Sequence, residues 1–166
     1  MSQQLSKSRF VTGCQCHKLL WWTVHEPGAV ELQPDLVLQD LFDQGRQVGE
    51  VARREFPGGV LIDLPHTERP ERVAATLAAL EAGAPAVFEV SFVADDTFVA
   101  IDVLERAGAG YRLVEVKSST SQKEEHLPDV AVQVHVARAT GIAIDRAEVM
   151  HLNLSLIHIS EPTRPY

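Results

Sequence analysis

The sequence predicts an α/β protein in which helices pack on a mixed β-sheet. Three consecutive segments are typical of strands, residues 86–92 (AVFEVSF), 97–104 (TFVAIDVL) and 111–119 (YRLVEVKSS), and short turn sequences separate them. Helical periodicity precedes these segments, and a helix followed by one further strand comes after them. This order predicts an α/β sandwich with a three-stranded antiparallel meander, a crossover helix and a fourth strand in the same sheet.

Helical segments precede the meander. Residues 5–25 are predicted as a helical entry, with Ser6 or Ser8 as a candidate cap. Pro34 opens a long helical segment that runs to about Arg54. Small and apolar residues recur along it at spacings of three and four, which predicts a buried face: Leu38, Leu41, Phe42, Gly45, Val48, Gly49 and Ala52.

A short connection and a second amphipathic helix lead into the meander. Residues 60–63 are predicted as a short strand or an extended link, and residues 67–82 as a helix that ends before Gly83. The apolar side of this helix is expected to carry Val73, Leu77 and Leu80. After the meander, a polar loop spans residues 119–126.

The last two predicted elements follow that loop. Pro128 starts a helix that continues through Thr140 and is closed by Gly141. Residues 147–152 are then predicted as the returning strand.

Composition is that of a single globular domain, with 166 residues of which 45% are hydrophobic and 23% charged. No apolar run approaches the roughly 20 residues of a membrane span, so a cytoplasmic protein is expected. The net charge of −8 argues against non-specific coating of nucleic acid. It does not exclude a nuclease, because metal ions neutralise an acidic site. Cys14 and Cys16 do not make a disulfide framework or a zinc-ligand pattern.

Residues 154–166 match, without a gap, one reading frame of an adaptor used in sequencing libraries. We therefore expect the native sequence to end near Asn153, with further residues of a longer parent protein missing. The alternative is a native strand in LSLIHIS followed by a turn. The predicted domain accordingly comprises residues 1–153.

Three carboxylates recur at a spacing of thirteen residues, one in each strand of the meander. The turn positions pair Glu89 with Asp102, and Asp102 with Glu115, whether the loops have two or four residues. The three side chains are then expected in one row on one face, with paired Cβ atoms about 5 Å apart. Lys117 shares the face of Glu115 because the strand period is two. Opposed like charges need a compensating cation, which predicts a metal-dependent phosphodiesterase site.

These residues resemble the D…(D/E)xK motif of the PD-(D/E)XK nuclease superfamily. Asp102 supplies the first position, and Glu115, Val116 and Lys117 supply the tripeptide. Gln133 lies where RecB-like members have the glutamine of QxxxY, although Ala137 replaces the tyrosine.

The resemblance extends along most of the chain. The segment LSKSRFVTGCQCHKLLW (residues 5–21) is similar to the opening of a bacterial RecB-like subfamily that is related to CRISPR-associated adaptation nucleases. Members of this subfamily carry a domain of unknown function and a further C-terminal domain. The resemblance implies a restriction-endonuclease-like core over residues 1–153, DNA as substrate, and a missing C-terminal domain of the same polypeptide.

The resemblance also implies the roles of the site residues. Asp102 and Glu115 would bind Mg²⁺ or Mn²⁺, which prefer oxygen ligands, and the carbonyl of Val116 could complete the shell. Lys117 would orient the attacking water and stabilise charge on the phosphate. Glu50 lies where the first helix of the family often presents an acid, with an exposed helical glutamate as the alternative reading.

Other candidate residues have weaker assignments. Glu89 and Gln133 are expected near the metal ligands without binding the ion directly, and a solvated strand edge is the alternative for Glu89. Cys16 matches a family cysteine that joins three C-terminal cysteines around a [4Fe–4S] cluster, which residues 1–153 do not hold unaided. Cys14 is expected to be a buried thiol.

Two other functions stay open. A nuclease-like fold that only binds nucleic acid or a protein partner is favoured by the missing tyrosine, and the intact Asp102, Glu115 and Lys117 argue against it. A metal or redox module built on Cys14 and Cys16 lacks the further cysteines that it would need.

Overall fold

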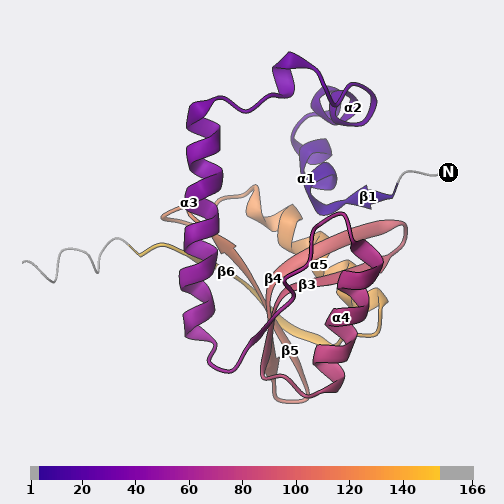
Figure 1. Ribbon diagram of the computed structural model, residues 1–166, viewed down its shortest axis with the longest axis vertical. Coiled ribbons are helices and arrows are strands. Elements are labelled where there is room, and N and C mark those ends of the chain that lie inside the picture. Colours follow the sequence, from indigo (N-terminus) through magenta and orange to yellow (C-terminus); the bar gives the residue numbers. More distant parts are fainter. Residues whose placement is uncertain (1–3, 154–166) are drawn as a thin grey trace, which may run out of the picture.

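The computed structural model describes residues 4–153, so the interpretation of residues 154–166 lies outside the described part. Within that part the chain forms six strands, five α-helices and two 3₁₀-helices (Figure 1). In chain order the elements are β1 (Leu5–Ser6), α1 (Lys7–Gln15), α2 (His17–His25), η1 (Val30–Leu32), α3 (Leu36–Ala52), η2 (Arg53–Glu55), β2 (Val60–Leu61), α4 (Arg69–Glu81), β3 (Ala86–Ala94), β4 (Thr97–Ala107), β5 (Gly110–Lys117), α5 (His126–Ala139) and β6 (Ile144–His151).

The six strands form one mixed sheet, in which five have the order β2-β3-β4-β5-β6 and β1 pairs with β4 beside this path, and this confirms the predicted α/β class. The β3–β4 and β4–β5 pairs are antiparallel, and β6 returns through α5 to lie parallel to β5. The meander, the crossover helix and the returning strand are therefore as predicted.

The N-terminal segment differs from the single helical entry that was predicted. Its first residues, Leu5 and Ser6, form β1 and pair in parallel with Thr97 and Phe98 of β4. The β4–β5 ladder begins only at Val103, so β1 lies along the part of β4 that this ladder leaves uncovered. The helix that follows breaks at Cys16, which has extended backbone and separates α1 from α2.

Two cores lie on opposite faces of the sheet. The larger core joins α4 and α5 to the strands, and its largest fully buried apolar side chains include Phe92, Ile101 and Leu104. The smaller core contains Phe56, Phe88 and Val114 on the other face, where α3 contacts β5. The helices thus cover both faces, with α3 standing apart from α4 and α5 (Figure 1).

Strand alternation is interrupted in the middle of β3 and β4. Glu89 has a positive φ of 58°, and the ladder skips it although its neighbours pair in register. Val87 and Val90 consequently pack in the same core although they are an odd number of residues apart, and so do Ile101 and Leu104. This irregularity lies at the level of two predicted site residues.

The predicted apolar faces of two helices need correction. In α3, Ala52 is buried, whereas Phe42 is 54% exposed, because only the C-terminal half of the helix reaches the sheet. In α4, Leu80 is buried as predicted, but Leu77 is exposed. The inward stripe of α4 includes Arg72 and Thr76, so polar side chains share the buried side of this helix.

Among residues 4–153, no helix is both long and apolar enough to cross a membrane.

Candidate active site

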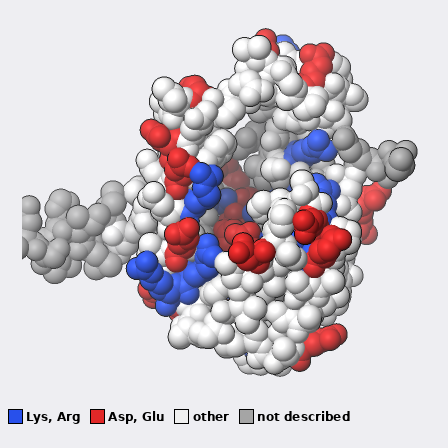
Figure 2. All heavy atoms as spheres, in the orientation of Figure 1, with Lys and Arg blue, Asp and Glu red and all other residues white. Residues whose placement is uncertain are grey.

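A pocket of about 370 Å³ lies between the C-terminal half of α3 and strands β3, β4 and β5. Figure 2 shows the surface hollowed between the side that carries α3 and the side that carries α4, with acidic and basic atoms around the hollow. Four carboxylates line the pocket, and they come from four segments of the chain: Glu50, Asp63, Glu89 and Asp102. Three arginines line it as well: Arg46, Arg53 and Arg72.

Asp102 sits where β4 and β5 stop pairing. The last backbone pair in this direction is Val103 with Val114, so the same register places Asp102 opposite Glu115. Instead of a ladder bond, the backbone N–H of Val116 donates to Asp102 Oδ2 at 2.7 Å. The side chain of Asp102 thus replaces a ladder bond and is fixed against β5. The register is the predicted one, but the sheet geometry is irregular at this point.

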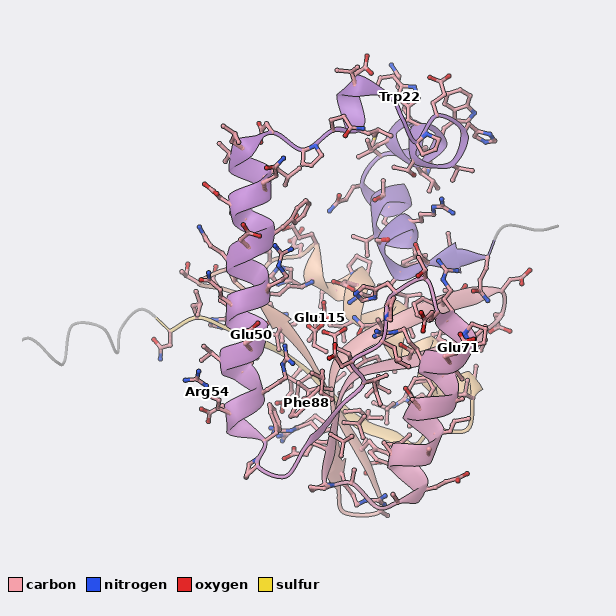
Figure 3. The ribbon with its side chains drawn as sticks, viewed as in Figure 1. Trp22, Glu50, Arg54, Glu71, Phe88 and Glu115 are labelled. Atoms are coloured by element: carbon pink, nitrogen blue, oxygen red, sulfur yellow. The ribbon has the colours of Figure 1, made fainter. Side chains whose placement is uncertain are left out.

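Glu115 is held by one side chain of its own strand and by side chains from two other parts of the chain. Its carboxylate is only 2% exposed and accepts hydrogen bonds from Lys117 Nζ at 2.7 Å and from Gln133 Nε2 at 2.8 Å. Lys7 Nζ, at the start of α1, donates to both oxygens at 3.1 and 3.2 Å. Figure 3 shows Glu115 coming from the sheet and Glu50 from α3. Two lysines and one amide therefore compensate this buried charge.

Asp129 on α5 completes the charged cluster. Lys117 Nζ lies 2.5 Å from Asp129 Oδ2, and Lys7 Nζ lies 3.5 Å from Oδ1. Gln133 Nε2 also donates to Asp129 Oδ1 at 3.0 Å, whereas Gln133 Oε1 is buried and has no hydrogen-bond partner among the described residues. The cluster therefore alternates carboxylates with cationic or amide donors.

Burial and mutual repulsion shift the ionisation of this cluster. Burial raises the pKa of Asp102 and of Glu115; the charge of Glu89 adds to the rise at Asp102, and the charges of Asp102 and Asp129 add to the rise at Glu115. Burial alone would lower the pKa of Lys7, but Glu115, Asp102 and Asp129 outweigh it and raise that pKa. The pKa of Lys117 is raised in the same way, and Lys7 and Lys117 lower that of Asp129 against the effect of burial. Both lysines are thus held charged.

The predicted residues are brought together, but not as one row on one face. Glu89, Asp102 and Glu50 line the pocket against α3 together with Val116. Glu115 does not line that pocket and contacts α1 and α5 instead. The physical reason is the interrupted alternation at Glu89 and Asp102, which simple period-two reasoning does not capture.

The cysteines lie apart from these residues. Cys14 and Cys16 are exposed free thiols, so the expected burial of Cys14 is wrong. The reason is that α1 and α2 have no buried residues of their own.

The donor set of the pocket fits a hard divalent cation in chemical type, because Glu50, Glu89 and Asp102 offer carboxylate oxygens. In residues 4–153, however, no three His, Cys, Asp or Glu side chains converge closely enough to enclose an ion. Ions that keep several of their own waters, as Mg²⁺ does, suit such a widely spaced set of oxygens better than a fully dehydrated site would.

Several residues of this region were not predicted from the sequence. Lys7 gives no local signal, because its contact with Glu115 spans 108 residues. Arg72 was missed because the apolar side of its helix was predicted to include the next residue, Val73, whereas Arg72 itself is buried. Asp129 could have been found, since it lies one helical turn before Gln133 and therefore on the same side of α5.

Comparison of the chain with protein-family models, with curated proteins and with solved structures finds no match.

Proposed function

We propose that the protein is a metal-dependent nuclease domain with a restriction-endonuclease-like core that hydrolyses phosphodiester bonds in DNA. The observation that supports this best is the pocket in which Glu50, Glu89 and Asp102 lie together beside the strand that carries Glu115 and Lys117. Burial raises the pKa of Asp102 in this pocket, and a carboxylate with a perturbed pKa in a concave site is typical of an active site.

The arginines of the pocket suit the proposed substrate. Arg46 and Arg53 lie on the α3 wall, and their guanidinium groups match the geometry of phosphate oxygens. They would bind the backbone of a strand and hold the scissile phosphate against Asp102. Local positive charge of this kind offsets the net charge of −8, which otherwise opposes binding of nucleic acid.

The proposed reaction assigns separate roles to the metal-binding residues and to Lys117. Asp102, Glu50 and the Val116 carbonyl would hold Mg²⁺ or Mn²⁺, with Glu115 and Glu89 at its edge. Bound there, such an ion lowers the pKa of a coordinated water and offsets charge on the phosphate. Lys117 would hold the attacking water at Nζ and donate to the phosphate oxygen, because its own charge is secured by Glu115 and Asp129.

One observation favours a second candidate, a nuclease-like fold that only binds nucleic acid or a protein. Both oxygens of Glu115 already accept hydrogen bonds from Lys7, and Lys117 and Gln133 add further bonds. A carboxylate satisfied in this way needs no ion. The two candidates differ in whether Lys117 matters for turnover.

The test is degradation of single- and double-stranded DNA by the purified protein in Mn²⁺. We expect Lys117→Ala to reduce cleavage by about 10²–10⁴-fold, the usual cost of losing a group that handles protons or charge in the reaction, while Mn²⁺ affinity measured by calorimetry stays close to that of the wild type. Asp102→Asn is expected to weaken both. Lys123→Ala is the matched control, because Lys123 is an exposed lysine six residues after Lys117 and its Nζ pairs with Glu125, which is also exposed.

Three results decide between the candidates. Cleavage that survives Lys117→Ala unchanged would contradict the catalytic assignment. Binding of DNA by the wild type without any cleavage in Mn²⁺ or Mg²⁺ would favour the binding module. Loss of cleavage in Lys123→Ala as well would show that any lost lysine weakens substrate binding, and the role of Lys117 would not be specific.

A further inference from the structure

Glu89 has a backbone conformation that its residue type rarely adopts. Three non-glycine residues among positions 4–153 have positive φ, namely Glu89 at 58°, Asp95 at 49° and Asp96 at 55°. Asp95 and Asp96 form the tight turn between β3 and β4, where such angles are expected. Glu89 lies inside β3, where the left-handed conformation of a long side chain is strained and needs support from its surroundings.

The support comes from Arg72 on α4, whose side chain is only 2% exposed. Its Nη2 donates to the backbone carbonyl of Glu89 at 2.9 Å and lies 3.5 Å from Glu89 Oε2. Its Nε donates to Ser91 Oγ at 3.0 Å, and its Nη1 donates to the carbonyl of Leu64. The planar guanidinium therefore donates hydrogen bonds both to Glu89, at the irregular position of β3, and to Ser91 beyond it.

A second residue of α4 fixes the other end of the irregularity. Thr76 Oγ1 accepts a hydrogen bond from the backbone N–H of Ser91 at 3.0 Å, and both residues are fully buried. Arg72 and Thr76 lie one helical turn apart, so α4 presents both groups to the same stretch of strand. Polar groups are costly to bury unless they are satisfied, and here they are satisfied by the backbone of the irregular strand.

The result is that the Glu89 side chain lines the α3 pocket together with Asp102, although the residues on either side of it pack in the cores. We infer that Arg72 is a positioning residue: it holds Glu89 in the left-handed conformation that places its carboxylate in the pocket. The structural part of this inference stands on its own, and only its consequence for ion binding rests on the proposed function.

The structural part is tested without metal by thermal melting in EDTA. At an ordinary strand position alanine is more stable than glycine, whereas at a left-handed position glycine is more stable. We expect Glu89→Gly to melt several degrees above Glu89→Ala. These two variants lose the same carboxylate, so the difference reports the backbone alone. The reverse order would overturn the inference.

The role of Arg72 is tested by rescue. Arg72→Lys keeps the charge but loses the planar fork, and we expect it to lower the melting temperature by several degrees. In the Glu89→Gly background the same change should cost less than half as much, because glycine holds the conformation without help. An equal loss in both backgrounds, or failure of both variants to fold, would show that Arg72 supports the fold independently of Glu89 and would overturn the inference. Folding of the double variant alone would be the strongest form of rescue.

The consequence for the site is tested by Mn²⁺ titration in a calorimeter. We expect Arg72→Lys to weaken Mn²⁺ binding at least fivefold in the wild-type background and to have no further effect in the Glu89→Gln background. An equal loss in both backgrounds would contradict action through Glu89. Absence of Mn²⁺ binding by the wild type would count against the proposed function, and the melting experiments would still decide the role of Arg72.

Discussion

The charged forms of Asp102 and Glu115 are less favourable in the folded protein than they would be in water. Both carboxylates are removed from water, and repulsion from Glu89 at Asp102 and from Asp102 at Glu115 adds to this effect, so their pKa values are raised. Asp129 pairs with Lys7 and Lys117, and the pKa of its carboxyl group is lowered. Neighbouring carboxyl groups therefore have pKa values shifted in opposite directions. Such a difference is common in sites where one carboxylate binds a ligand and another pairs with a lysine.

These shifts predict an unusual dependence of stability on pH. Because the folded forms of Asp102 and Glu115 bind protons more tightly than the unfolded chain, the free energy of unfolding should rise as the pH falls from 7 towards 5. The contribution of Asp129 has the opposite sign and should be lost only below about pH 4, near the carboxyl pKa of an unfolded chain. Urea denaturation in EDTA across this range measures the effect.

Asp102→Asn isolates the effect of one of the two carboxylates. The amide can still accept the N–H of Val116, so we expect the variant to be more stable at pH 7 by about 1 kcal/mol, with a flatter pH profile. Glu124→Gln removes the same charge at an exposed position and controls for the net charge of the protein. Destabilisation by Asp102→Asn at pH 7 would contradict the assigned pKa directions.

At the scale of elements, the start of β5 lies very close to the start of β6 and to the residue before it. Gly110 begins β5, and a Cβ atom built there would lie 2.7 Å from both the carbonyl oxygen of Ala143 and Asp145 Oδ2. Gly45, in the middle of α3, has nothing within 4 Å of such an atom. One glycine is thus required by packing and the other is not.

The two glycines should respond to alanine with opposite signs. Gly110→Ala is expected to lower the free energy of unfolding by about 1–3 kcal/mol, because the backbone of residue 143 has to move. Gly45→Ala should raise it by roughly 0.5–1 kcal/mol, since alanine has the higher helix propensity. Chemical denaturation of both variants measures this. A loss of stability in Gly45→Ala would show that α3 packs against something at that position.

The predicted elements were largely correct because local patterns specify them. The alternation in β3 to β5 and the turns at Asp95 and Gly108 determine the meander, and the resulting register correctly places Glu89, Asp102 and Glu115 at one level. What local patterns do not contain is the irregularity at Glu89, since it depends on Arg72 from another element. The contact of Lys7 with the site was missed for the same reason.

At the scale of the whole molecule, packing is uneven. Ile101 and Val90 in the central strands are fully buried, whereas the N-terminal half of α3 exposes Leu41, Phe42 and neighbouring apolar residues. Helices depend on tertiary packing for most of their stability, so this half of α3 has little to hold it. The α3 wall of the pocket is therefore anchored mainly through the C-terminal end of the helix.

This difference predicts a gradient in amide hydrogen exchange. Amides in the first two turns of α3 should exchange about 100-fold faster or more than those of β4, because they open without global unfolding. Mass spectrometry at two protein concentrations measures the gradient and controls for self-association. Equal protection of α3 and β4 at both concentrations would contradict the uneven packing.

The position of β1 has a consequence for the order in which the molecule is assembled. Lys7 is synthesised 108 residues before its partner Glu115, and β1 cannot pair with β4 until β4 has been made. Contacts of such long sequence separation form late and slow the folding of a chain. A growing chain on the ribosome therefore carries Lys7 without Glu115, and β1 without β4, while the intervening residues are made, and the charged centre forms only when the meander is complete and β1 pairs with it.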